Sequence, residues 1–485
     1  MNTVKKKYGL WTGMAMVVGI VIGSGVFLKA GKVLRFSNGN LKISLLAWLI
    51  GGLIMVSSGF CFAIFANREK NFNGVVDYVE KASNKRVSYH LAWLISTLYY
   101  PTVASIVSVF AGAYVLELFG AAGKIVGDGY ATIYQLLSCW QTYLVGFGFL
   151  TLFSLLNYFA PRLSGKFQIS ATVIKLIPIL VIAIVGLFAS LIVDGRGLVD
   201  AFSVNAPSAE NISMNFGEAV KTTAFAYEGW VCATIINAEL KDSKKNLPKA
   251  LAGGTAAIVV FYILYYIGIS AFLGNGEAIA QDANAPLVIF NTLLGKVGEK
   301  VFCVFIIVSC LGTVNGVTLS CARGFYTMAV RGQGPQPEKI AQLDSKSNMS
   351  WRSCLAGYIY SVILLVIWYL ANTGKPYFQY LGNMDAIVCA LIYGCFIVMF
   401  IYMMKNYKDL SVFKRYVMPI IAIVGCSFFV LVGTGLFQLI SGDKGAALKE
   451  FGCWCILLLV ICGPSLFFYR KKPTFIVDNN VNEKD

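Results

Sequence analysis

Charged residues are scarce in this sequence, and histidine is almost missing. Only 13% of the 485 residues are charged, whereas 57% are hydrophobic. Soluble domains carry about 25% charged residues, so a soluble globular protein is excluded. The single histidine, His90, cannot supply a His-based metal site or a Ser-His-Asp triad. No Gly-rich phosphate loop ending in Lys-Ser or Lys-Thr is present. We therefore expect no enzyme, no metal, no cofactor and no direct use of ATP.

Long apolar stretches account for most of the chain. A transmembrane helix needs about 20 predominantly apolar residues. Twelve such stretches start near residues 10, 43, 89, 138, 167, 219, 249, 297, 353, 379, 414 and 450. They are helical in scale and lack the alternation of a membrane barrel. No small-residue cleavage site follows the first stretch, so we expect a first span and not a signal peptide. The predicted fold class is all-α integral membrane, with 12 transmembrane helices.

The net charge of +16 is distributed as in a membrane protein. The N-terminus, the even-numbered loops and the C-terminus hold 26 of the 40 Lys and Arg, and the odd-numbered loops hold 12. This bias predicts that both termini are cytoplasmic in a multi-pass protein of the cell membrane. The expected partner is the lipid bilayer, with some attraction to anionic lipid heads, and not nucleic acid.

The chain is expected to form one polytopic membrane domain over residues 1–471. The loops are short, and the polar tail over residues 472–485 is predicted to be a disordered cytoplasmic segment. Most of the thirteen cysteines lie inside apolar stretches, as Cys232, Cys310 and Cys389 do. Buried cysteine behaves as a small hydrophobe, so free thiols are expected.

Glycine interrupts the first and the sixth apolar stretches. The first reads VVGIVIGSGVFLKAG from Val17 to Gly31, although glycine costs a helix about 1 kcal/mol per residue. The sixth contains FAYEGW from Phe225 to Trp230. Paired interruptions at corresponding places indicate an inverted-repeat transporter. We place the two repeats at about 10–193 and 219–404 and two extra helices at about 414–470.

Broken helices in a membrane point to a polar cavity, because an unsatisfied backbone group in hydrocarbon costs several kcal/mol. The amides at one half-helix end suit a carboxylate, and the carbonyls at the other suit an ammonium. Together they predict an α-amino acid as ligand. Small residues also allow close helix packing, and packing is the preferred interpretation of Gly19 and Gly31. For Gly23, Ser24 and Gly25 we favour a binding site.

These stretches resemble the amino acid–polyamine–organocation superfamily, most closely its L-amino-acid transporter branch with the bacterial serine/threonine-type exchangers. The resemblance covers the membrane region and rests on four ordered motifs. They are Gly19 to Phe27, Phe225 to Trp230, NAELKDSKKNLPKA from Asn237 to Ala250, and LGTVNGVTLSCARGFYTMAVRGQGP from Leu311 to Pro335. The family implies the five-plus-five inverted-repeat fold of the leucine transporter, with two further helices.

The resemblance also implies a substrate site for an L-amino acid at the two breaks. The amides around Ser24 and Gly25 would receive the substrate carboxylate, carbonyls near Val21, Phe225 and Glu228 the ammonium, and Phe225 would close over the substrate. The full set of predicted substrate-binding residues is Val21, Ile22, Gly23, Ser24, Gly25, Phe225, Ala226, Tyr227, Glu228 and Gly229.

Two ionisable residues inside spans are functional hypotheses by default. The family places a lysine like Lys175 where sodium-coupled relatives hold sodium, which implies sodium-independent transport. Lys175 could instead cap carbonyls structurally, or couple transport to protons. Glu228 has three open interpretations, namely contact with a cationic or polar substrate side chain, titration during transport, or pairing with an internal neighbour. Arg323 is expected to be structural or part of an inner gate, and Asp385 has no assigned role.

Some features depart from the family. The second stretch reads SGFCFAIFANREKNFNGVVDYV where relatives have Tyr-Ala-Glu-Leu and then Pro-Lys-X-Gly-Gly, which leaves the cytoplasmic gate undefined. The loop between spans three and four lacks the cysteine that tethers a glycoprotein subunit in animal relatives, so no heavy-chain partner is expected. The predicted function is a sodium-independent amino acid exchanger working by alternating access. The alternatives are a proton-coupled amino acid symporter and a non-transporting amino acid receptor or scaffold.

Overall fold

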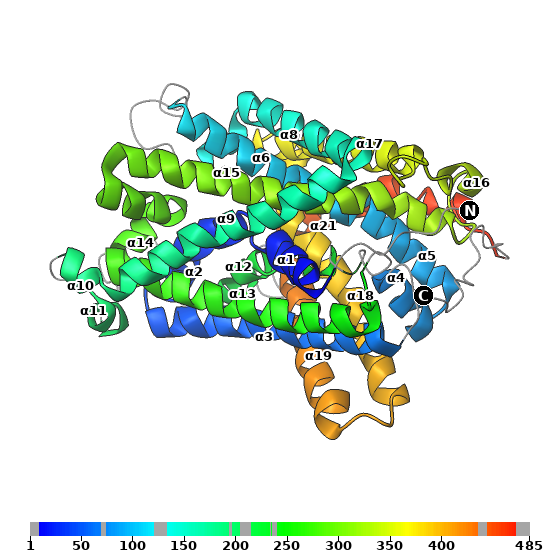
Figure 1. The fold of residues 1–485 in the computed structure, drawn as a ribbon, viewed down its shortest axis with the longest axis horizontal. Helices are drawn as coiled ribbons and strands as arrows, with labels where there is room; N and C mark the ends of the chain where they lie inside the picture. Colours follow the sequence, from blue (N-terminus) through cyan, green and yellow to red (C-terminus); the bar gives the residue numbers. More distant parts are fainter. Residues whose placement is uncertain are drawn as a thin grey trace.

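The computed structural model describes residues 9–68, 74–120, 133–193, 196–203, 215–232, 234, 240–434 and 444–471. These residues form helices and short helical turns, with no strand among them. The longest helices lie side by side in one bundle (Figure 1). The described part of the chain therefore confirms an all-α fold. The predicted tail over residues 472–485 lies outside the described residues.

The bounds of the helices follow the chain order. The helices are α1 (Leu10–Val21), α2 (Gly25–Phe36), α3 (Leu41–Arg68), α4 (Val75–Ala82), α5 (Lys85–Leu94), α6 (Tyr100–Leu118), α8 (Trp140–Phe159), α9 (Pro161–Leu187), α10 (Ala189–Ile192), α11 (Leu198–Ser203), α12 (Phe216–Ala226), α13 (Ser243–Leu273), α14 (Asn275–Gln281), α15 (Ala285–Ala329), α16 (Pro337–Ile340), α17 (Trp351–Asn372), α18 (Met384–Asn406), α19 (Met418–Gly433), α21 (Lys444–Cys462) and α22 (Ser465–Phe468). Short 3-10 turns are η2 (Gln135–Ser138), η4 (Asp282–Asn284) and η5 (Phe378–Leu381), and π-helical turns are η1 (Ile95–Tyr99) and η6 (Phe413–Val417).

Ten helices in the described residues are long and apolar enough to cross a membrane, or eleven if the bent pair α1 and α2 counts as one span. The predicted number of twelve is not confirmed. The sixth span is described only through α12 and the turn at 230–232, because residues 233 and 235–239 lie outside the described residues.

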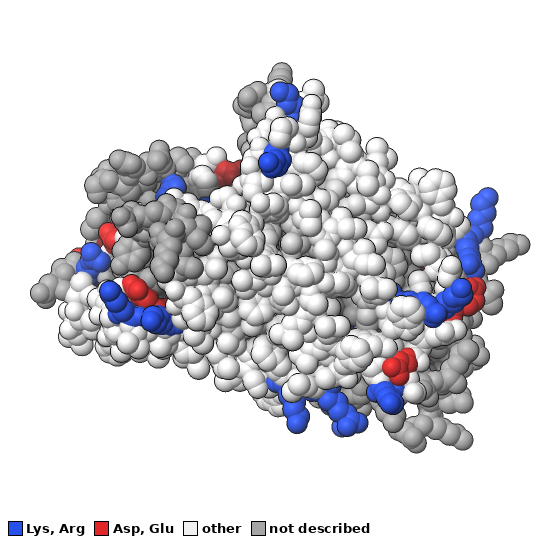
Figure 2. All heavy atoms as spheres, turned by 90° about the horizontal axis from the view of Figure 1, so that it is seen from above, with Lys and Arg blue, Asp and Glu red and all other residues white. Residues whose placement is uncertain are grey.

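The middle of one face carries no charged side chain, and the Lys, Arg, Asp and Glu visible there lie around its edges (Figure 2). This distribution suits a protein surrounded by lipid.

The first predicted break is present. Helices α1 and α2 meet at an angle of 49°. Ile22 leaves the helical region with φ −73° and ψ 88°, and α2 begins at Gly25. The glycines of the GSG sequence therefore lie where the chain changes direction inside an apolar core.

The second predicted break lies beside the first. Helix α12 ends at Ala226, and Gly229 has φ +102°, which a residue with a side chain rarely adopts. Helix α2 packs on α12. A Cβ atom built on Gly25 would lie only 2.8 Å from the Ala226 Cα. The missing side chain of Gly25 is thus what lets the two breaks meet.

Small residues also allow the long helices to pack closely. A Cβ atom on Gly186 of α9 would lie 2.3 Å from the Gly268 Cα of α13, so these two helices touch through their backbones. Helix α1 packs against α9, α13 and α15 (Figure 1). The predicted packing role of Gly31 is consistent with its position, because its Cβ would lie 2.5 Å from the Asp282 Cα.

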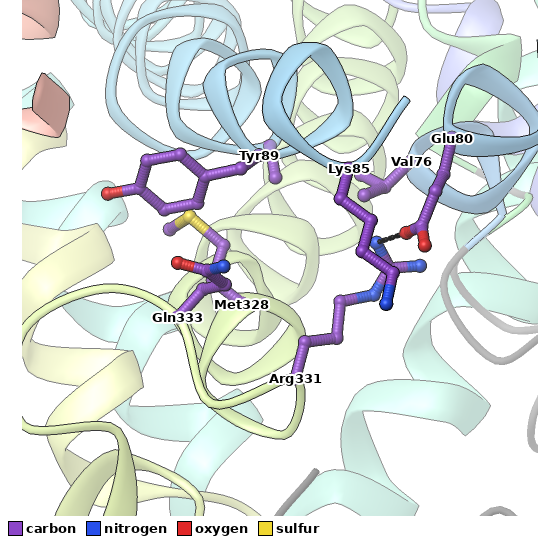
Figure 3. Close-up of a pocket in the computed structure, with 8 residues that line it drawn as sticks. Val76, Glu80, Lys85, Tyr89, Met328, Arg331 and Gln333 are labelled. Carbon is purple, nitrogen blue, oxygen red and sulfur yellow. Dashed lines mark hydrogen bonds and ion pairs between the residues drawn. The ribbon is translucent and has the colours of Figure 1, made fainter. Parts of the chain in front are cut away.

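A half-buried ion cluster joins α4 to the end of α15. Arg331 pairs with Asp77 and Glu80 and donates a hydrogen bond to Ser88 Oγ at 3.2 Å. Figure 3 shows Glu80, Lys85 and Arg331 converging at one side of a pocket between α5 and α15. Burial lowers the pKa of Arg331 to about 10, so the guanidinium stays charged at neutral pH.

The last span docks on the same end of the bundle. Tyr89 Oη donates to the Ser465 carbonyl at 3.1 Å, and Trp93 Nε1 donates to the Ile461 carbonyl at 3.0 Å. Gln333 Nε2 donates to the Arg470 carbonyl at 2.8 Å. These contacts hold the end of the described chain beside α5 and the segment after α15.

The contact of Gly25 with α12 generates a stability prediction. Gly25→Ala should destabilise the fold by about 2 kcal/mol or more, because overpacking against a backbone atom cannot be relieved by a side-chain rotation. We expect a lower melting temperature or loss of folded protein in detergent. The control is Gly148→Ala in α8, where no atom lies within 4 Å of the new Cβ. It should melt at the same temperature or higher, since alanine favours helix by about 1 kcal/mol. Equal melting of both variants would contradict the close approach.

Candidate functional site

A buried lysine lies against the first break. Lys175 of α9 is 0% exposed, and its Nζ donates hydrogen bonds to the carbonyl oxygens of Gly19 and Ile22. Thr313 Oγ1 lies 3.4 Å from the same Nζ. The ammonium therefore caps the carbonyls that the break releases and links α9 to the broken span. The role that the family resemblance implies for Lys175 stays a prediction.

Two hydroxyls of α15 complete the coverage of these carbonyls. Thr313 Oγ1 donates to the Ile20 carbonyl at 3.1 Å, and Ser309 Oγ lies 3.3 Å from the carbonyl oxygens of Ile22 and Gly23. A Cβ on Gly23 would lie 3.0 Å from Thr313 Oγ1, so the glycine admits the hydroxyl. Sequence reasoning missed both side chains. Hydroxyls one helical turn apart in an apolar stretch are the signal that could have found them.

The second half of the break presents backbone amides, at the start of α2. Ser24 precedes α2, and the first amides of a helix have no partner within the helix and carry its positive dipole end. Ser24 Oγ is buried beside the Cys310 thiol and makes no well-formed hydrogen bond among the described residues. Gly25 itself is buried against α12, with the Ala226 Cα 2.8 Å from the position of its missing Cβ. The arrangement offers hydrogen-bond donors to an anion.

A tyrosine of α13 bridges the two breaks. Tyr262 Oη donates to the Ala226 carbonyl at 2.8 Å and lies 3.3 Å from the Val21 carbonyl. The Phe225 carbonyl accepts the Glu228 amide at 3.3 Å. The Val21 carbonyl also accepts the Gly23 amide at 2.8 Å, so both of its lone pairs have a donor in this structure. Sequence reasoning missed Tyr262.

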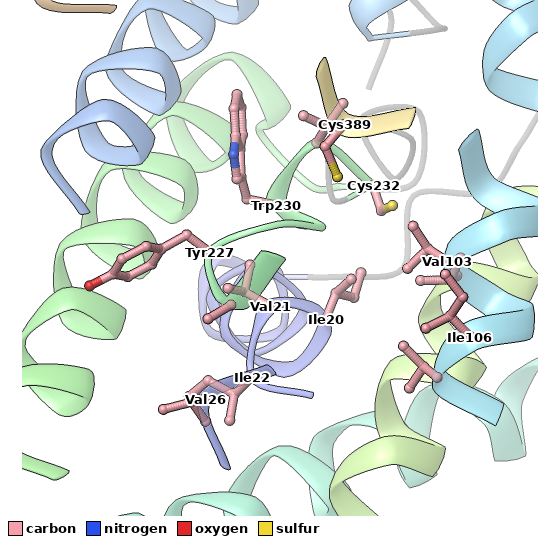
Figure 4. Packing of buried hydrophobic residues seen from close by; sticks show 14 of the residues in the cluster. Ile20, Val21, Ile22, Val26, Val103, Ile106, Tyr227, Trp230, Cys232 and Cys389 are labelled. Carbon is pink, nitrogen blue, oxygen red and sulfur yellow. The ribbon is translucent and has the colours of Figure 1, made fainter. Parts of the chain in front are cut away.

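Tyr227 belongs to the site only through its backbone. Its hydroxyl donates to the Trp48 carbonyl of α3 at 3.0 Å, and its ring packs on Trp48 and Tyr262. Figure 4 shows Tyr227 pointing away from Ile20 and Val21, with Cys232 and Cys389 on the other side of the break. Val103 and Ile106 of α6 form the facing wall of the apolar packing in this view. The surroundings of the breaks are therefore largely apolar.

Glu228 is buried and has an internal partner. It is 5% exposed, and Tyr99 Oη donates a hydrogen bond to its Oε1. Tyr393 and Cys389 of α18 lie close to the carboxylate, but no well-formed hydrogen bond reaches Oε2. Among the described residues, no ion pair involves Glu228. The contacts with Tyr99, Tyr393, Cys389 and the Gly229 amide favour the third sequence interpretation, pairing with an internal neighbour.

Phe225 lies beneath a cation of α2. Lys29 Nζ is 5.4 Å from the centroid of the Phe225 ring, within the range of a cation–π contact. The same ammonium is 4.0 Å from an Asp385 carboxylate oxygen. Lys29 and Asp385 therefore join α2, α12 and α18 directly above the predicted aromatic gate. No sequence pattern indicates that these two residues pair, because they are far apart along the chain.

Arg323 and His90 lie away from the breaks. Arg323 lines a cavity beside α1, with its Nη2 3.6 Å from the Met349 sulfur. His90 contacts Ser465 Oγ through Nδ1 at 3.0 Å, which is a packing position. All thirteen cysteines are described and are free thiols, as the sequence predicts.

The chain matches the family described as amino acid permease over residues 8–462. It is 28% identical over 481 residues to the serine/threonine exchanger SteT of Bacillus subtilis (strain 168), covering 97% of this chain and 98% of that protein. It is 24% identical over 432 residues to the b(0,+)-type amino acid transporter 1 of Rattus norvegicus, covering 89% and 83%. The cystine/glutamate transporter of Homo sapiens is 25% identical over 332 residues, covering 68% and 62%.

A solved structure shares the fold. The crystal structure of MhsT in complex with L-phenylalanine aligns with a TM-score of 0.59 at 14% sequence identity, over 88% of this chain and all of that one. At this identity the likeness concerns the fold alone, and it agrees with the leucine-transporter-like architecture predicted above. The family match, which covers nearly the whole membrane region, decides the identity. This chain belongs to the amino acid permease family.

Proposed function

We propose that this protein is a sodium-independent amino acid exchanger that works by alternating access. As a member of a permease family it is a transport protein and not an enzyme. The names of its relatives, which include a serine/threonine exchanger and a b(0,+)-type amino acid transporter, support amino acids as the substrate class.

The contacts of Lys175 carry the proposal. Oxygen ligands from unwound backbone and hydroxyls are what a sodium ion finds in broken-helix transporters. Here the Lys175 ammonium already donates to the carbonyls of Gly19 and Ile22, beside Thr313. A fixed cation in this cluster takes the role of a bound sodium ion, so transport does not need one. The same ammonium holds α1 against α9, and its contacts differ once α1 moves.

The substrate zwitterion fits between the two breaks. In this proposal the amides at Ser24 and Gly25 bind its carboxylate, and carbonyls near Val21, Phe225 and Glu228 bind its ammonium. Ile22, Gly23, Ala226, Tyr227 and Gly229 contribute backbone around it, and Phe225 closes over it. The buried Ser24 hydroxyl, which has only the Cys310 thiol beside it and no well-formed hydrogen bond, supports a polar ligand at this point.

Glu228 extends the proposed substrate range to basic amino acids. A buried carboxylate without a cation nearby is costly, and one oxygen of Glu228 has no well-formed hydrogen bond. A substrate ammonium or guanidinium would supply both the charge and the donor. Pairing with Tyr99 alone is the competing interpretation, and it predicts no role in selectivity.

The proposed setting is the cell membrane with both termini cytoplasmic. The excess of Lys and Arg in the termini and even-numbered loops supports this orientation. Both described ends of the chain lie near one face, because Thr12 lines a cavity with Arg323, and Arg470 binds Gln333. We propose that the protein works without a glycoprotein subunit.

Uptake into proteoliposomes tests the proposed function. We expect labelled L-serine to enter only when the vesicles contain unlabelled amino acid, at the same rate in sodium and in choline. Uptake driven into empty vesicles by an imposed pH gradient would instead identify a proton-coupled symporter. Saturable binding without counterflow would identify a receptor.

The contacts of Lys175 predict the outcome of Lys175→Ala. Removing the ammonium leaves buried carbonyls without their donor and loosens α1 from α9, so counterflow should fall almost to background while the protein stays folded. Uptake is measured together with size-exclusion elution and thermal melting. Lys42→Ala, at an exposed lysine, is the control and should transport normally. Wild-type rates in Lys175→Ala would disprove the mechanism.

Another prediction concerns Glu228→Gln, which keeps an acceptor for Tyr99 and removes only the charge. Lysine and arginine should compete for wild-type uptake and lose about tenfold or more in the variant, the effect of one hydrogen bond to a charged group. Competition by neutral amino acids should remain. A panel of all twenty amino acids against one labelled substrate gives the readout. An unchanged profile would assign Glu228 to internal pairing.

A further inference from the structure

The turn that joins α18 to α19 projects from the bundle, past α3 at the bottom of Figure 1. Arg68, the last residue of α3, pairs with Asp409 in this turn, and its Cζ lies 4.4 Å from the centroid of the Tyr407 ring. We call residues 405–417, from the end of α18 through the π-helical turn η6, the α18–α19 hairpin. None of its residues belongs to the proposed substrate site.

One arginine ties the two arms of the hairpin together. Arg415 of η6 donates from Nε to the Met404 carbonyl at 2.8 Å, and its Nη2 lies 3.5 Å from the Lys405 carbonyl. These carbonyls belong to the last turn of α18, where they have no amide partner within the helix and form its negative dipole end. The guanidinium therefore joins the start of α19 to the end of α18 and gives the hairpin a defined shape.

The hairpin carries an excess of positive charge. Lys405, Lys408 and Lys414 are exposed, and no carboxylate in the described part of the chain pairs with any of them. Asp409 is the only acidic residue of the hairpin, and Arg68 already pairs with it. Three ammonium groups are therefore left for an external anion.

Large apolar side chains are exposed beside these lysines. Val412 is 71% exposed and Phe413 is 53% exposed, and Tyr416 and Val417 are exposed as well. The exposed apolar positions continue into α19 at Ile420. The apolar surface that α19 presents to lipid therefore extends into the hairpin.

Both arms place the hairpin at the boundary of the membrane. The candidate span formed by α18 ends at Asn406, and the next candidate span begins at Phe413. Lysine side chains near the end of a transmembrane helix reach toward the lipid head groups. The proposed orientation puts this even-numbered loop at the cytoplasmic face, where anionic lipids are found.

We propose that the α18–α19 hairpin is a docking surface for the head groups of anionic phospholipids. The ammonium groups of Lys405, Lys408 and Lys414 bind the phosphates, and Val412 and Phe413 enter the lipid layer beside them. A basic surface next to exposed apolar side chains fits a lipid, which offers both an anionic head group and an apolar chain. A nucleic acid or an acidic protein would match the charge alone. The surface is separate from the substrate site, so the proposal does not depend on amino acid exchange.

Photolabelling in nanodiscs tests the place and the charge preference of this contact. The protein is embedded in phosphatidylcholine that contains a photoreactive probe, either phosphatidylglycerol or phosphatidylcholine with a diazirine next to the head group. Labelled peptides are identified by mass spectrometry. The phosphatidylglycerol probe should label peptides from residues 405–417 about tenfold more than the phosphatidylcholine probe does, because each lysine near an anionic surface adds about fivefold to binding. In 1 M NaCl this excess should disappear, since the Debye length falls to about 3 Å.

Two variants of the hairpin show whether the lysines cause the excess. The combined variant Lys405→Gln, Lys408→Gln and Lys414→Gln should remove it. Arginine at the same three positions keeps the charge and should retain it. Size-exclusion elution and thermal melting should match the wild-type protein in both variants, because the three side chains are exposed.

The matched control changes the same amount of charge elsewhere on the predicted cytoplasmic side. It combines Lys81→Gln, Lys245→Gln and Lys249→Gln, at exposed positions without an exposed large apolar residue among the described residues within four positions. The phosphatidylglycerol excess on the hairpin should remain in this control.

Equal labelling by the two probes in the wild-type protein would show contact without recognition of charge and would overturn the proposal. So would an excess that survives the glutamine substitutions in the hairpin, or one that the control substitutions also remove. The measurement does not require transport. If no amino acid is exchanged but the excess depends on the three lysines, the docking surface stands and only the proposed function fails.

Discussion

A carbonyl inside a membrane must find a donor, and this constraint organises the molecule. Opening a helix between Val21 and Gly25 releases backbone oxygens where no water is available. One ammonium of α9 and two hydroxyls of α15 supply the hydrogen-bond donors for these oxygens. Because these donors come from two other helices, the break and its surroundings form one unit. The unwound segment is stable only while α1, α9 and α15 are in place.

The features that depend on local chemistry could be predicted from the sequence. Glycine inside an apolar stretch predicts the breaks, and both are present at Gly23–Gly25 and after Ala226. A lone lysine in an apolar stretch predicts a buried partner, and Lys175 lies against the first break. The family and the all-helical membrane fold are confirmed. The number of spans is not, because part of the sixth lies outside the described residues.

Other parts of the site could not be predicted, for a physical reason. Tyr262, Tyr99 and the Lys29–Asp385 pair act across 36 to more than 300 residues of sequence, and the side chains alone do not reveal which helix faces which. A tyrosine in an apolar stretch looks the same whether its hydroxyl reaches a broken helix or the lipid surface. Such contacts are set by helix rotation and packing, and one sequence does not contain that information.

The π-helical turn η1 has a consequence for the third span as a whole. Tyr100 donates to the Ile95 carbonyl five residues back, and Pro101, which has no amide hydrogen, follows at once. One additional residue in a turn shifts the phase of a helix by about 100°. That shift lets Ser88 face Arg331 at one end while Tyr99 faces Glu228 in the core. The length of this stretch therefore sets the rotational phase of the two helical parts on either side of it. An insertion or deletion of a single residue there would misalign two distant polar contacts at once.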